Sequence, residues 1–358
     1  MFATDVHGGF GGIAQYNRDI IDSICGMEQV AQVVVLPRIM PEARFASPAK
    51  STYDLASAMG IKNYVLRGAA HAMTRYDMVY CAHINLLPIA SAVARVRRLP
   101  LVLAIYGIDA WQRPAGSARR FGIGAVSLVI SISKITLERF RKWSGVPENQ
   151  CAVLPNAIHT ENFAVGTKRN ALAHRLGVTG RPVILTFGRM SADERYKGFD
   201  EVIEAMPRLA ARVPGLVYVA AGEGSDRTRL EAKAKSLGVS EHVKFSGRVS
   251  EAEKADLYRL ADAYVMPSSG EGFGFVVLEA LACGIPVVAS RTDGTREAVR
   301  DGELGLLVDP QDSTGLEAAI IEALSRPKAI PPGLDYFSFA NFKKRLSIEL
   351  AKILPVLA

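Results

Sequence analysis

The sequence lacks the features of membrane-spanning, secreted and disordered chains. The longest apolar run in the 358 residues, Ile123–Ile132, is far shorter than the roughly 20 residues that cross a bilayer. The first ten residues contain no basic segment followed by an apolar one, so no signal peptide is expected. Hydrophobic residues make up 49% and charged residues 22% of the chain, a balance that argues against disorder.

Cysteine is scarce, and its spacing matches neither a zinc site nor a disulfide framework. There is no C-x-x-C pair and no cysteine–histidine cluster. Because each cysteine has apolar neighbours, we expect buried free thiols in a reducing compartment. The four are Cys25, Cys81, Cys151 and Cys283.

Acidic residues are fewer than basic ones, and the difference lies almost entirely in the first half of the chain. Residues 1–165 contain 17 Lys and Arg against 11 Asp and Glu, whereas residues 166–358 contain 26 against 25. Such a basic face suits anionic lipid or an acidic acceptor, and equally a solvated surface that keeps the protein soluble. Nucleic acid is not expected as a partner, because aromatic residues do not alternate with the basic ones. The basic residues concerned are Arg95, Arg97, Arg98, Arg113, Arg119, Arg120, Arg139, Arg141 and Lys142.

Short apolar runs alternate with helical patterns along the chain, which predicts an α/β fold with doubly wound parallel sheets. The length suits two domains, because one core seldom grows beyond about 250–300 residues. We expect an N-terminal domain over residues 1–165, a second over 166–335 and a C-terminal helix over 336–358. The expected strands of the first half are Met1–Val6, Val30–Pro37, Tyr76–Ala82, Leu101–Tyr106, Val126–Ser133 and Cys151–Pro155. Those of the second half are Arg181–Phe187, Leu216–Ala221, Val243–Ser246, Ala263–Pro267, Pro286–Ser290 and Leu304–Val308.

The C-terminal segment has apolar residues at helical spacing. An amphipathic helix packed on the body of the protein is the favoured interpretation, and a helix lying on a membrane surface is the alternative. The apolar residues are Phe339, Phe342, Leu346, Leu350 and Ile353.

A glycine loop near the start, Gly8-Gly9-Phe10-Gly11-Gly12, opens a helix at Ile13. The strand before it must be short, or the chain begins late. A strand, a glycine loop and a helix form the context of a phosphate or sugar site. The loop is not a G-x-G-x-x-G motif and no acidic residue closes a second strand, so a dinucleotide dehydrogenase is not expected.

The stretch Ser269–Glu279 is the most informative one. Glycines at 270, 272 and 274 permit a tight turn and close approach of a ligand, and the following helix N-terminus suits a phosphate. Glu271 and Glu279 flank the turn. The sharper interpretation is a site for a phosphate-bearing ligand with polyol recognition, and the plainer one is a glycine turn with two surface glutamates.

Other polar residues follow neighbouring strands of the second half. Ligands of doubly wound sheets bind beyond the carboxyl ends of the strands, so these residues are expected to meet at one edge. They are Arg189, Lys197, Glu223, Arg248, Glu271 and Thr295.

With these motifs in view, the chain resembles the retaining nucleotide-sugar glycosyltransferases of family 4. The resemblance covers nearly the whole chain and implies the GT-B fold, in which two Rossmann-like domains face each other across a cleft and a C-terminal helix packs back on the body. It is carried by Glu271 and Glu279 as the E-x7-E pair, Gly188-Arg189, Lys197-Gly198, Gly222-Glu223-Gly224, Leu154-Pro155-Asn156 and Gly11-Gly12-Ile13.

The resemblance implies roles for the residues of the second domain. Arg189 and Lys197 would hold the donor diphosphate and neutralise its growing charge, so that no metal and no cofactor is needed. Glu279 would accept hydrogen bonds from the ribose, and Glu271 would face the donor sugar. The other expected donor-side residues are Gly188, Glu223, Arg248, Val249, Gly272, Phe273, Gly274, Phe275 and Val276.

The first domain would hold the acceptor, and it contains a departure from the family pattern. Where many members have His-Gly, this chain has Tyr106-Gly107. His83, at the end of the preceding strand, is a candidate to replace the missing imidazole, although a lone histidine is more often structural. In the second domain, Asp293 stands where Gly-Gly is frequent. The expected acceptor- or sugar-side residues are Gly11, Gly12, His83, Tyr106 and Asp109.

The implied function is retaining transfer of a hexose from a UDP- or GDP-linked donor to a glycan or polyprenyl-linked acceptor, in exopolysaccharide or cell-envelope glycan biosynthesis. The expected location is cytoplasmic, with peripheral contact between the basic domain and the inner face of the plasma membrane. A GT-B nucleotide-sugar epimerase or hydrolase, a glycoside hydrolase with two carboxylates and a non-catalytic protein of the same fold are the alternatives.

Overall fold

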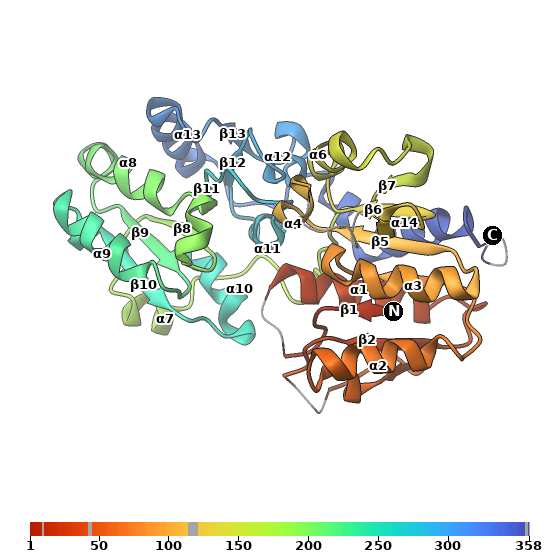
Figure 1. Cartoon of the computed structure of the whole chain (residues 1–358). Helices are drawn as coiled ribbons and strands as arrows, with labels where there is room; N and C mark the ends of the chain where they lie inside the picture. Colours follow the sequence, from red (N-terminus) through yellow and green to blue (C-terminus); the bar gives the residue numbers. More distant parts are fainter. Residues whose placement is uncertain (9–10, 42–44, 114–120, 355–356, 358) are drawn as a thin grey trace. The chain divides into compact units, whose positions relative to one another are not determined.

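A computed structural model describes residues 1–8, 11–41, 45–113, 121–354 and 357, which form two compact units (Figure 1). One unit comprises Met1–Ala157 with Phe339–Ala358, and the other comprises Ile158–Ser338. The chain thus passes to the second unit at 157–158 and returns at 338–339, where the sequence suggested 165–166 and 335–336. Ile158 belongs to the second unit because its backbone N–H donates to the Phe337 carbonyl over 2.8 Å.

The first unit is built on a parallel sheet, which the described residues form in the order β3-β2-β1-β4-β5-β6-β7. The expected short first strand is confirmed, and it lies between β2 and β4. The apolar run 123–132 is strand only in its second part. The strands are β1 (Phe2–Ala3), β2 (Val33–Pro37), β3 (Ser51–Tyr53), β4 (Val79–Cys81), β5 (Leu101–Ile105), β6 (Leu128–Ser131) and β7 (Cys151–Val153).

The helices of the first unit begin and end where the sequence supplies the residues for it. Ser133 caps α6 by accepting a hydrogen bond from the Thr136 N–H over 3.3 Å, and Gly145 ends it in the left-handed conformation. The helices are α1 (Gly12–Cys25), α2 (Ile61–His71), α3 (Leu87–Arg97), α4 (Ile108–Trp111), α6 (Lys134–Ser144) and α14 (Phe339–Ala351).

The C-terminal helix α14 packs on α1, as the amphipathic pattern predicted. Phe342, Leu346 and Leu350 are buried, whereas the lysines between them are exposed. The Phe342 ring meets Tyr16 of α1 edge to face, with centroids 5.5 Å apart. The last segment of the chain is therefore part of the first unit's core.

The second unit has its own parallel sheet, formed by the described residues in the order β10-β9-β8-β11-β12-β13. In chain order this is 3-2-1-4-5-6, the strand order of the Rossmann fold. The order reverses between β8 and β11. The strands are β8 (Val183–Phe187), β9 (Val217–Ala221), β10 (Val243–Gly247), β11 (Ala263–Met266), β12 (Val287–Ser290) and β13 (Leu306–Val308).

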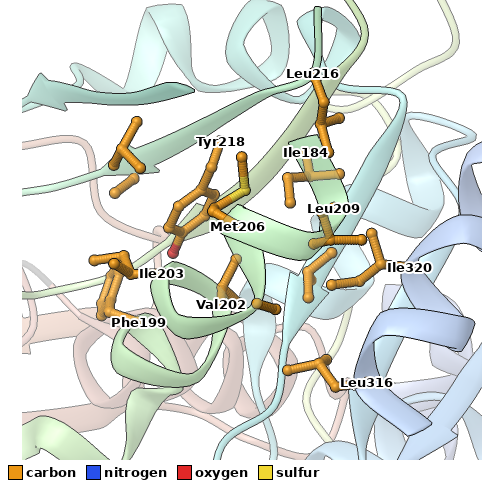
Figure 2. Packing of buried hydrophobic residues seen from close by; sticks show 14 of the residues in the cluster. Ile184, Phe199, Val202, Ile203, Met206, Leu209, Leu216, Tyr218, Leu316 and Ile320 are labelled. Atoms are coloured by element: carbon orange, nitrogen blue, oxygen red, sulfur yellow. The ribbon is translucent and has the colours of Figure 1, made fainter. Parts of the chain in front are cut away.

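Helices connect these strands and cover the sheet. The amphipathic helix α8 turns one apolar face, from Phe199 to Leu209, toward Ile184 of β8 and Tyr218 of β9 (Figure 2). Leu316 and Ile320 of α13 belong to the same buried cluster. The helices are α7 (Asn170–Arg175), α8 (Phe199–Arg212), α9 (Arg227–Ser236), α10 (Glu251–Leu260), α11 (Phe275–Ala282), α12 (Thr295–Ala298) and α13 (Ser313–Ser325).

The four cysteines are free, and three of them are buried as predicted. Cys151 is half-buried instead, because it begins β7, the outermost strand of its sheet. Over the residues that the structure covers, no helix combines the length and the apolar character needed to cross a membrane.

Candidate active site

The candidate site of the second unit lies where the strand order reverses. β8 and β11 are neighbours in the sheet, and their chain continuations run to opposite sides. Such a point leaves a crevice beyond the carboxyl ends of the strands. The loop after β8 carries Gly188 and Arg189 and leads to a 3-10 helix, Ala192–Lys197, while the loop after β11 carries Glu271.

Lys197 and Glu271 form an ion pair across this point, with the Lys197 Nζ donating a hydrogen bond to Glu271 Oε1. Their side chains are 13% and 16% exposed, so both charges are largely removed from water. Burial alone lowers the pKa of Lys197, but the Glu271 carboxylate outweighs it and the pKa is raised above its ordinary value. The ion pair therefore keeps Lys197 as an ammonium.

Arg189 lies on the rim of the same place and is 68% exposed. Its guanidinium binds Glu194 in a fork, with Nε–Oε2 at 3.1 Å and Nη2–Oε1 at 2.5 Å. Glu194 Oε2 is also 3.8 Å from Lys197 Nζ, so the two expected diphosphate-binding cations share one carboxylate. The sequence pattern gave no signal for Glu194, which lies in the 3-10 helix Ala192–Lys197, outside the motifs.

The helix α11 begins at Phe275, shortly after Glu271 in the chain. Gly274 is its N-cap, with φ at 96° in the left-handed region, and no side-chain hydrogen bond caps this helix within the described residues. Phe275 and Val276 are half-buried, so backbone N–H groups of this turn could serve a phosphate. Phe273 is buried against Phe337, with centroids 5.6 Å apart, so it can serve a ligand only through its backbone.

Glu279 of α11 is 7% exposed and already engaged. Its Oε1 accepts a hydrogen bond from Lys254 Nζ over 2.8 Å, and its Oε2 accepts one from the Tyr258 hydroxyl over 2.6 Å. Burial lowers the pKa of Lys254, but Glu279 reverses the effect and raises it. Both partners come from α10, and sequence reasoning missed them. A ribose at Glu279 would have to share the carboxylate with this pair.

Glu223, Arg248 and Val249 lie together at the next two strand ends. The Arg248 N–H donates to Glu223 Oε1 over 3.3 Å, and the Glu223 and Arg248 side chains are exposed. Glycine is required beside them at Gly222, because φ there is 125° and a Cβ would collide with the Gly188 carbonyl. The backbones after β8 and β9 therefore pack directly together.

Asp293 and Thr295 are the exception among the residues near this edge. Both are buried, and the Thr295 hydroxyl donates a hydrogen bond to Asp293 Oδ1 over 2.7 Å. Thr295 follows β12 as the sequence predicted, but its hydroxyl is used inside the unit.

The first unit places its expected residues after β1, β4 and β5, again around the point where strand order reverses. Gly11 is the N-cap of α1, with φ at 140°, and Gly12 begins that helix. Gly9 and Phe10 of the glycine loop, like Arg119 and Arg120 of the basic set, lie outside the described residues.

His83, Tyr106 and Asp109 lie together. The imidazole of His83 stacks on the Tyr106 ring, with centroids 6.2 Å apart, and its Nε2 is 3.8 Å from Asp109 Oδ2. Its Nδ1 accepts a hydrogen bond from the Asn85 N–H over 3.1 Å, which leaves Nε2 as the protonated nitrogen of the neutral ring. A ligand hydroxyl at the side of this pair could accept a hydrogen bond from Nε2 and donate one to Oδ2.

The Tyr106 hydroxyl is committed elsewhere, because it donates to Asn17 Oδ1 of α1 over 3.0 Å. Its pKa is raised by burial, so this phenol stays protonated. Burial also raises the pKa of Asp109 to about 7, against hydrogen bonds from the local backbone. In the part of the chain that the structure describes, no cluster of three or more His, Cys, Asp or Glu side chains could hold a metal ion.

Two family models match the chain, one in each half. The model described as "Glycosyltransferase Family 4" matches residues 20–162, and the one described as "Glycosyl transferases group 1" matches residues 169–330.

Among curated proteins, the chain is similar to a GDP-mannose-dependent alpha-(1-6)-phosphatidylinositol monomannoside mannosyltransferase of Mycolicibacterium smegmatis. The two are 35% identical over 218 residues, which are 59% of this chain and 56% of the relative. A D-inositol 3-phosphate glycosyltransferase of Geodermatophilus obscurus is 37% identical over 53% of this chain and 43% of its own. The chain thus spans about half the length of the curated relatives it matches.

Solved structures share the fold over nearly the whole chain. Anabaena HepE in complex with UDP has a TM-score of 0.75 at 21% identity, covering 98% of this chain and 99% of its own. Sucrose-phosphate synthase from Thermosynechococcus elongatus has a TM-score of 0.70 at 21% identity, covering 99% and 92%. The predicted α/β fold with two Rossmann-like domains is confirmed. The chain belongs to the GT-B glycosyltransferases, with a family 4 domain followed by a group 1 domain.

Proposed function

We propose that this chain is a retaining glycosyltransferase that moves a hexose from a UDP- or GDP-linked donor to a glycan or lipid-linked acceptor. The observation that carries the proposal is the largely buried Lys197–Glu271 pair at the point where β8 and β11 diverge. A nucleotide sugar bound there offers its diphosphate to the ammonium and its sugar to the carboxylate. Lys197 then neutralises charge that grows on the leaving diphosphate, and Glu271 binds a sugar hydroxyl or stabilises an oxocarbenium-like transition state.

The proposed reaction needs no metal and no cofactor besides the donor itself. Lys197 supplies a point charge, and Arg189 supplies a planar fork suited to phosphate oxygens. Binding of a diphosphate would replace the Glu194 carboxylate as the partner of Arg189. The N-terminus of α11 adds backbone donors beside these two cations.

GDP-mannose is the first donor to test, and a UDP-linked hexose is the second. The names of several relatives at 33–35% identity specify GDP-mannose. The fold neighbour HepE was solved with UDP and with UDP-glucose, which supports the alternative. In either case Glu279, held by Lys254 and Tyr258, is the proposed ribose acceptor group.

The proposed acceptor site is in the first unit, around His83 and Asp109. His83 Nε2 and Asp109 Oδ2 are 3.8 Å apart, so one hydroxyl group that approaches the pair from the side can reach both, and the imidazole stacks on Tyr106. The names of the mannosyltransferase relatives specify phosphatidylinositol and its mannosides as acceptors. A lipid-linked glycan of the cell envelope is therefore the proposed acceptor class.

Contact with an anionic membrane surface is part of the proposal, and α2 carries its support. Val65, Leu66 and Met73, in α2 and just beyond it, are 49%, 66% and 85% exposed, an unusual apolar surface for a helix on a soluble unit. Lys62 and Arg75 are the neighbouring cations, whereas Arg67 is paired with Asp54 over 2.7 Å. Exposed apolar side chains flanked by cations fit the interface of an anionic bilayer. The proposed location is the cytoplasmic face of that membrane, and free thiols fit a reducing compartment.

Release of free nucleotide tests the function directly. The protein is incubated with GDP-mannose or UDP-glucose, with and without vesicles that contain phosphatidylinositol or a polyprenyl-diphosphate sugar. We expect release from one donor that depends on one acceptor, that is equal in EDTA and in Mg²⁺, and that yields a product with the anomeric configuration of the donor. Glu271→Ala should lower the rate by at least about 100-fold, the scale of losing one preorganised electrostatic contact. Lys235→Ala, an exposed cation of α9, is the matched control.

The alternatives give different results in the same assay. Release that is independent of any acceptor would favour a hydrolase or epimerase. Nucleotide binding without release from any donor would favour a non-catalytic protein of this fold. Release that Glu271→Ala leaves unchanged would refute the role of the Lys197–Glu271 pair.

A further inference from the structure

Asp293 lies in the turn between β12 and α12. Its side chain is buried, with the residue 1% exposed. Burial raises the pKa of its carboxyl, and hydrogen bonds from Ser268 and Thr295 oppose the rise. A buried carboxylate is costly unless its oxygens are well supplied with donors.

The donors around Asp293 come from two loops. Oδ2 accepts from the Ser268 hydroxyl over 2.7 Å and from the backbone N–H of Glu271 over 2.9 Å. Oδ1 accepts from the backbone N–H of Thr295 over 3.0 Å and from its hydroxyl over 2.7 Å. Each oxygen thus faces one backbone N–H and one hydroxyl group.

The neighbouring residue completes the connection in the opposite direction. The Gly294 N–H donates to the Glu271 carbonyl over 2.9 Å. A Cβ at position 294 would collide with the Gly272 backbone, so the two loops are in direct backbone contact. Both backbone polar groups of Glu271 are therefore held by the pair Asp293-Gly294.

We propose that Asp293 is a positioning residue for sugar transfer, which fixes the backbone of Glu271 and so directs its carboxylate toward Lys197 and the donor sugar. The inference rests on the proposed function, and it adds a residue that touches neither substrate nor reacting atoms. A misplacement of about 1 Å at a reacting group can cost on the order of 100-fold in rate, so a rigid support for Glu271 matters.

The arrangement distinguishes aspartate from asparagine. An asparagine would place an NH₂ group where one of the two oxygens now lies. The hydroxyl groups of Ser268 and Thr295 can rotate to accept from it, but the backbone N–H of Glu271 or of Thr295 cannot. Asp293→Asn therefore loses one backbone hydrogen bond in either orientation of the amide, at nearly constant volume.

Hydrogen exchange of the free protein tests the support without any donor. Asp293→Asn should increase amide exchange in residues 268–275 by at least about tenfold, with little change in β8 and β9. Asp262→Asn is the matched control, because Asp262 Oδ2 also accepts a backbone hydrogen bond, from the Val183 N–H over 2.9 Å, away from Glu271. Unchanged exchange at 268–275 in Asp293→Asn would overturn the inference.

Turnover then tests the consequence for chemistry. With the donor and acceptor that support turnover in the nucleotide-release assay, Asp293→Asn should lower kcat by about 10–100-fold while the dissociation constant of the nucleoside diphosphate changes by less than about threefold. In the Glu271→Ala background the same substitution should add little, because it acts through Glu271. Asp262→Asn should lower stability without this kcat loss.

The outcomes separate the two proposals. The positioning role would be refuted if Asp293→Asn lowered kcat equally in the wild-type and Glu271→Ala backgrounds. It would also be refuted if the loss of kcat were explained by the loss of folding stability alone. A wild-type protein that turns over no donor would refute the proposed function, and hydrogen exchange at 268–275 would then decide whether Asp293 fixes this loop.

Discussion

Among single residues, paired charge is the common feature of the candidate donor site. Lys197 faces Glu271, and Lys254 faces Glu279, each pair largely removed from water. Truncating one member leaves the other as an uncompensated buried charge, which destabilises the folded protein. Each pair is therefore kept together by this cost as well as by attraction. In the proposed reaction, a donor phosphate that approaches Lys197 would meet a cation that is already desolvated and oriented.

Asp109 gives a residue-scale prediction about pH. Burial raises its pKa to about 7, so between about pH 4 and pH 7 the folded protein keeps a proton that the unfolded chain releases. Folding stability contributed by this group is therefore lost as the pH rises toward 7. Asp109→Asn removes the ionisation, and its stability relative to wild type should be greater at pH 8 than at pH 5 by about 1 kcal/mol or more. Urea unfolding of both proteins at the two pH values measures the difference.

The control for Asp109→Asn is a carboxyl without such surroundings. His83 faces the carboxyl across 3.8 Å, and Tyr106 lies behind the imidazole. Glu138→Gln removes an exposed carboxyl of α6 in the same unit and should show no such pH dependence. If the Asp109→Asn difference is the same at pH 5 and pH 8, the carboxyl does not titrate in this window.

The residues that carry motifs could be predicted from the sequence, whereas their partners could not. Arg189, Lys197 and Glu271 come after strands that can be recognised as apolar runs in the sequence. Their meeting at one sheet edge is then a consequence of the strand order. Lys254 lies on a helix face like many others, and only the packing of α10 against α11 brings it to Glu279. The roles of the glutamates toward a donor stay predictions.

At the scale of elements, the strands were easier to predict than the connections. Buried parallel strands are continuous apolar runs, and most were found within two or three residues of their ends. β3, Ser51–Tyr53, was missed because it is a short polar strand at the edge of the sheet. α2 was not singled out because its buried face consists of Tyr64 and Gly68, so the usual apolar stripe is absent.

The exposed face of α2 gives the element-scale prediction. Leu66→Asp should lower the fraction of protein that floats with vesicles of 30% phosphatidylglycerol and 70% phosphatidylcholine by about tenfold, because it replaces inserted apolar surface with a charge that the lipid repels. Leu66 is 66% exposed, so the fold should be unaffected. Density-gradient flotation at low and high salt measures the binding.

Leu237→Asp, an exposed leucine at the end of α9 in the other unit, is the matched control. It should float like wild type. Wild-type protein that does not float with these vesicles, or a Leu66→Asp variant that floats equally, would contradict a membrane-binding role for α2.

For the whole molecule, the return of the chain to the first unit makes that unit depend on residues 339–358. Phe342→Ala in α14 should destabilise the first unit by about 3–5 kcal/mol, because Phe342 is 1% exposed against Tyr16. Both tryptophans, Trp111 and Trp143, lie in this unit, so their fluorescence reports its unfolding alone. The urea midpoint of the fluorescence transition should fall by about 1 M or more.

Ile348→Ala on the exposed side of α14 should leave that midpoint nearly unchanged. The second unit should unfold as in wild type in both variants, as followed by circular dichroism. Equal midpoints for Phe342→Ala and Ile348→Ala would mean that α14 is not part of the first unit's cooperative core.

The position of α14 also has a consequence for how the chain is made. Residues 1–157 leave the ribosome long before residues 339–358. Until α14 is made, the apolar side chains of α1 that it covers stay uncovered in the nascent first unit. Residues 158–338 form one continuous stretch and can complete their sheet while the ribosome is still attached. The half of the protein that is synthesised first is therefore the half that is finished last.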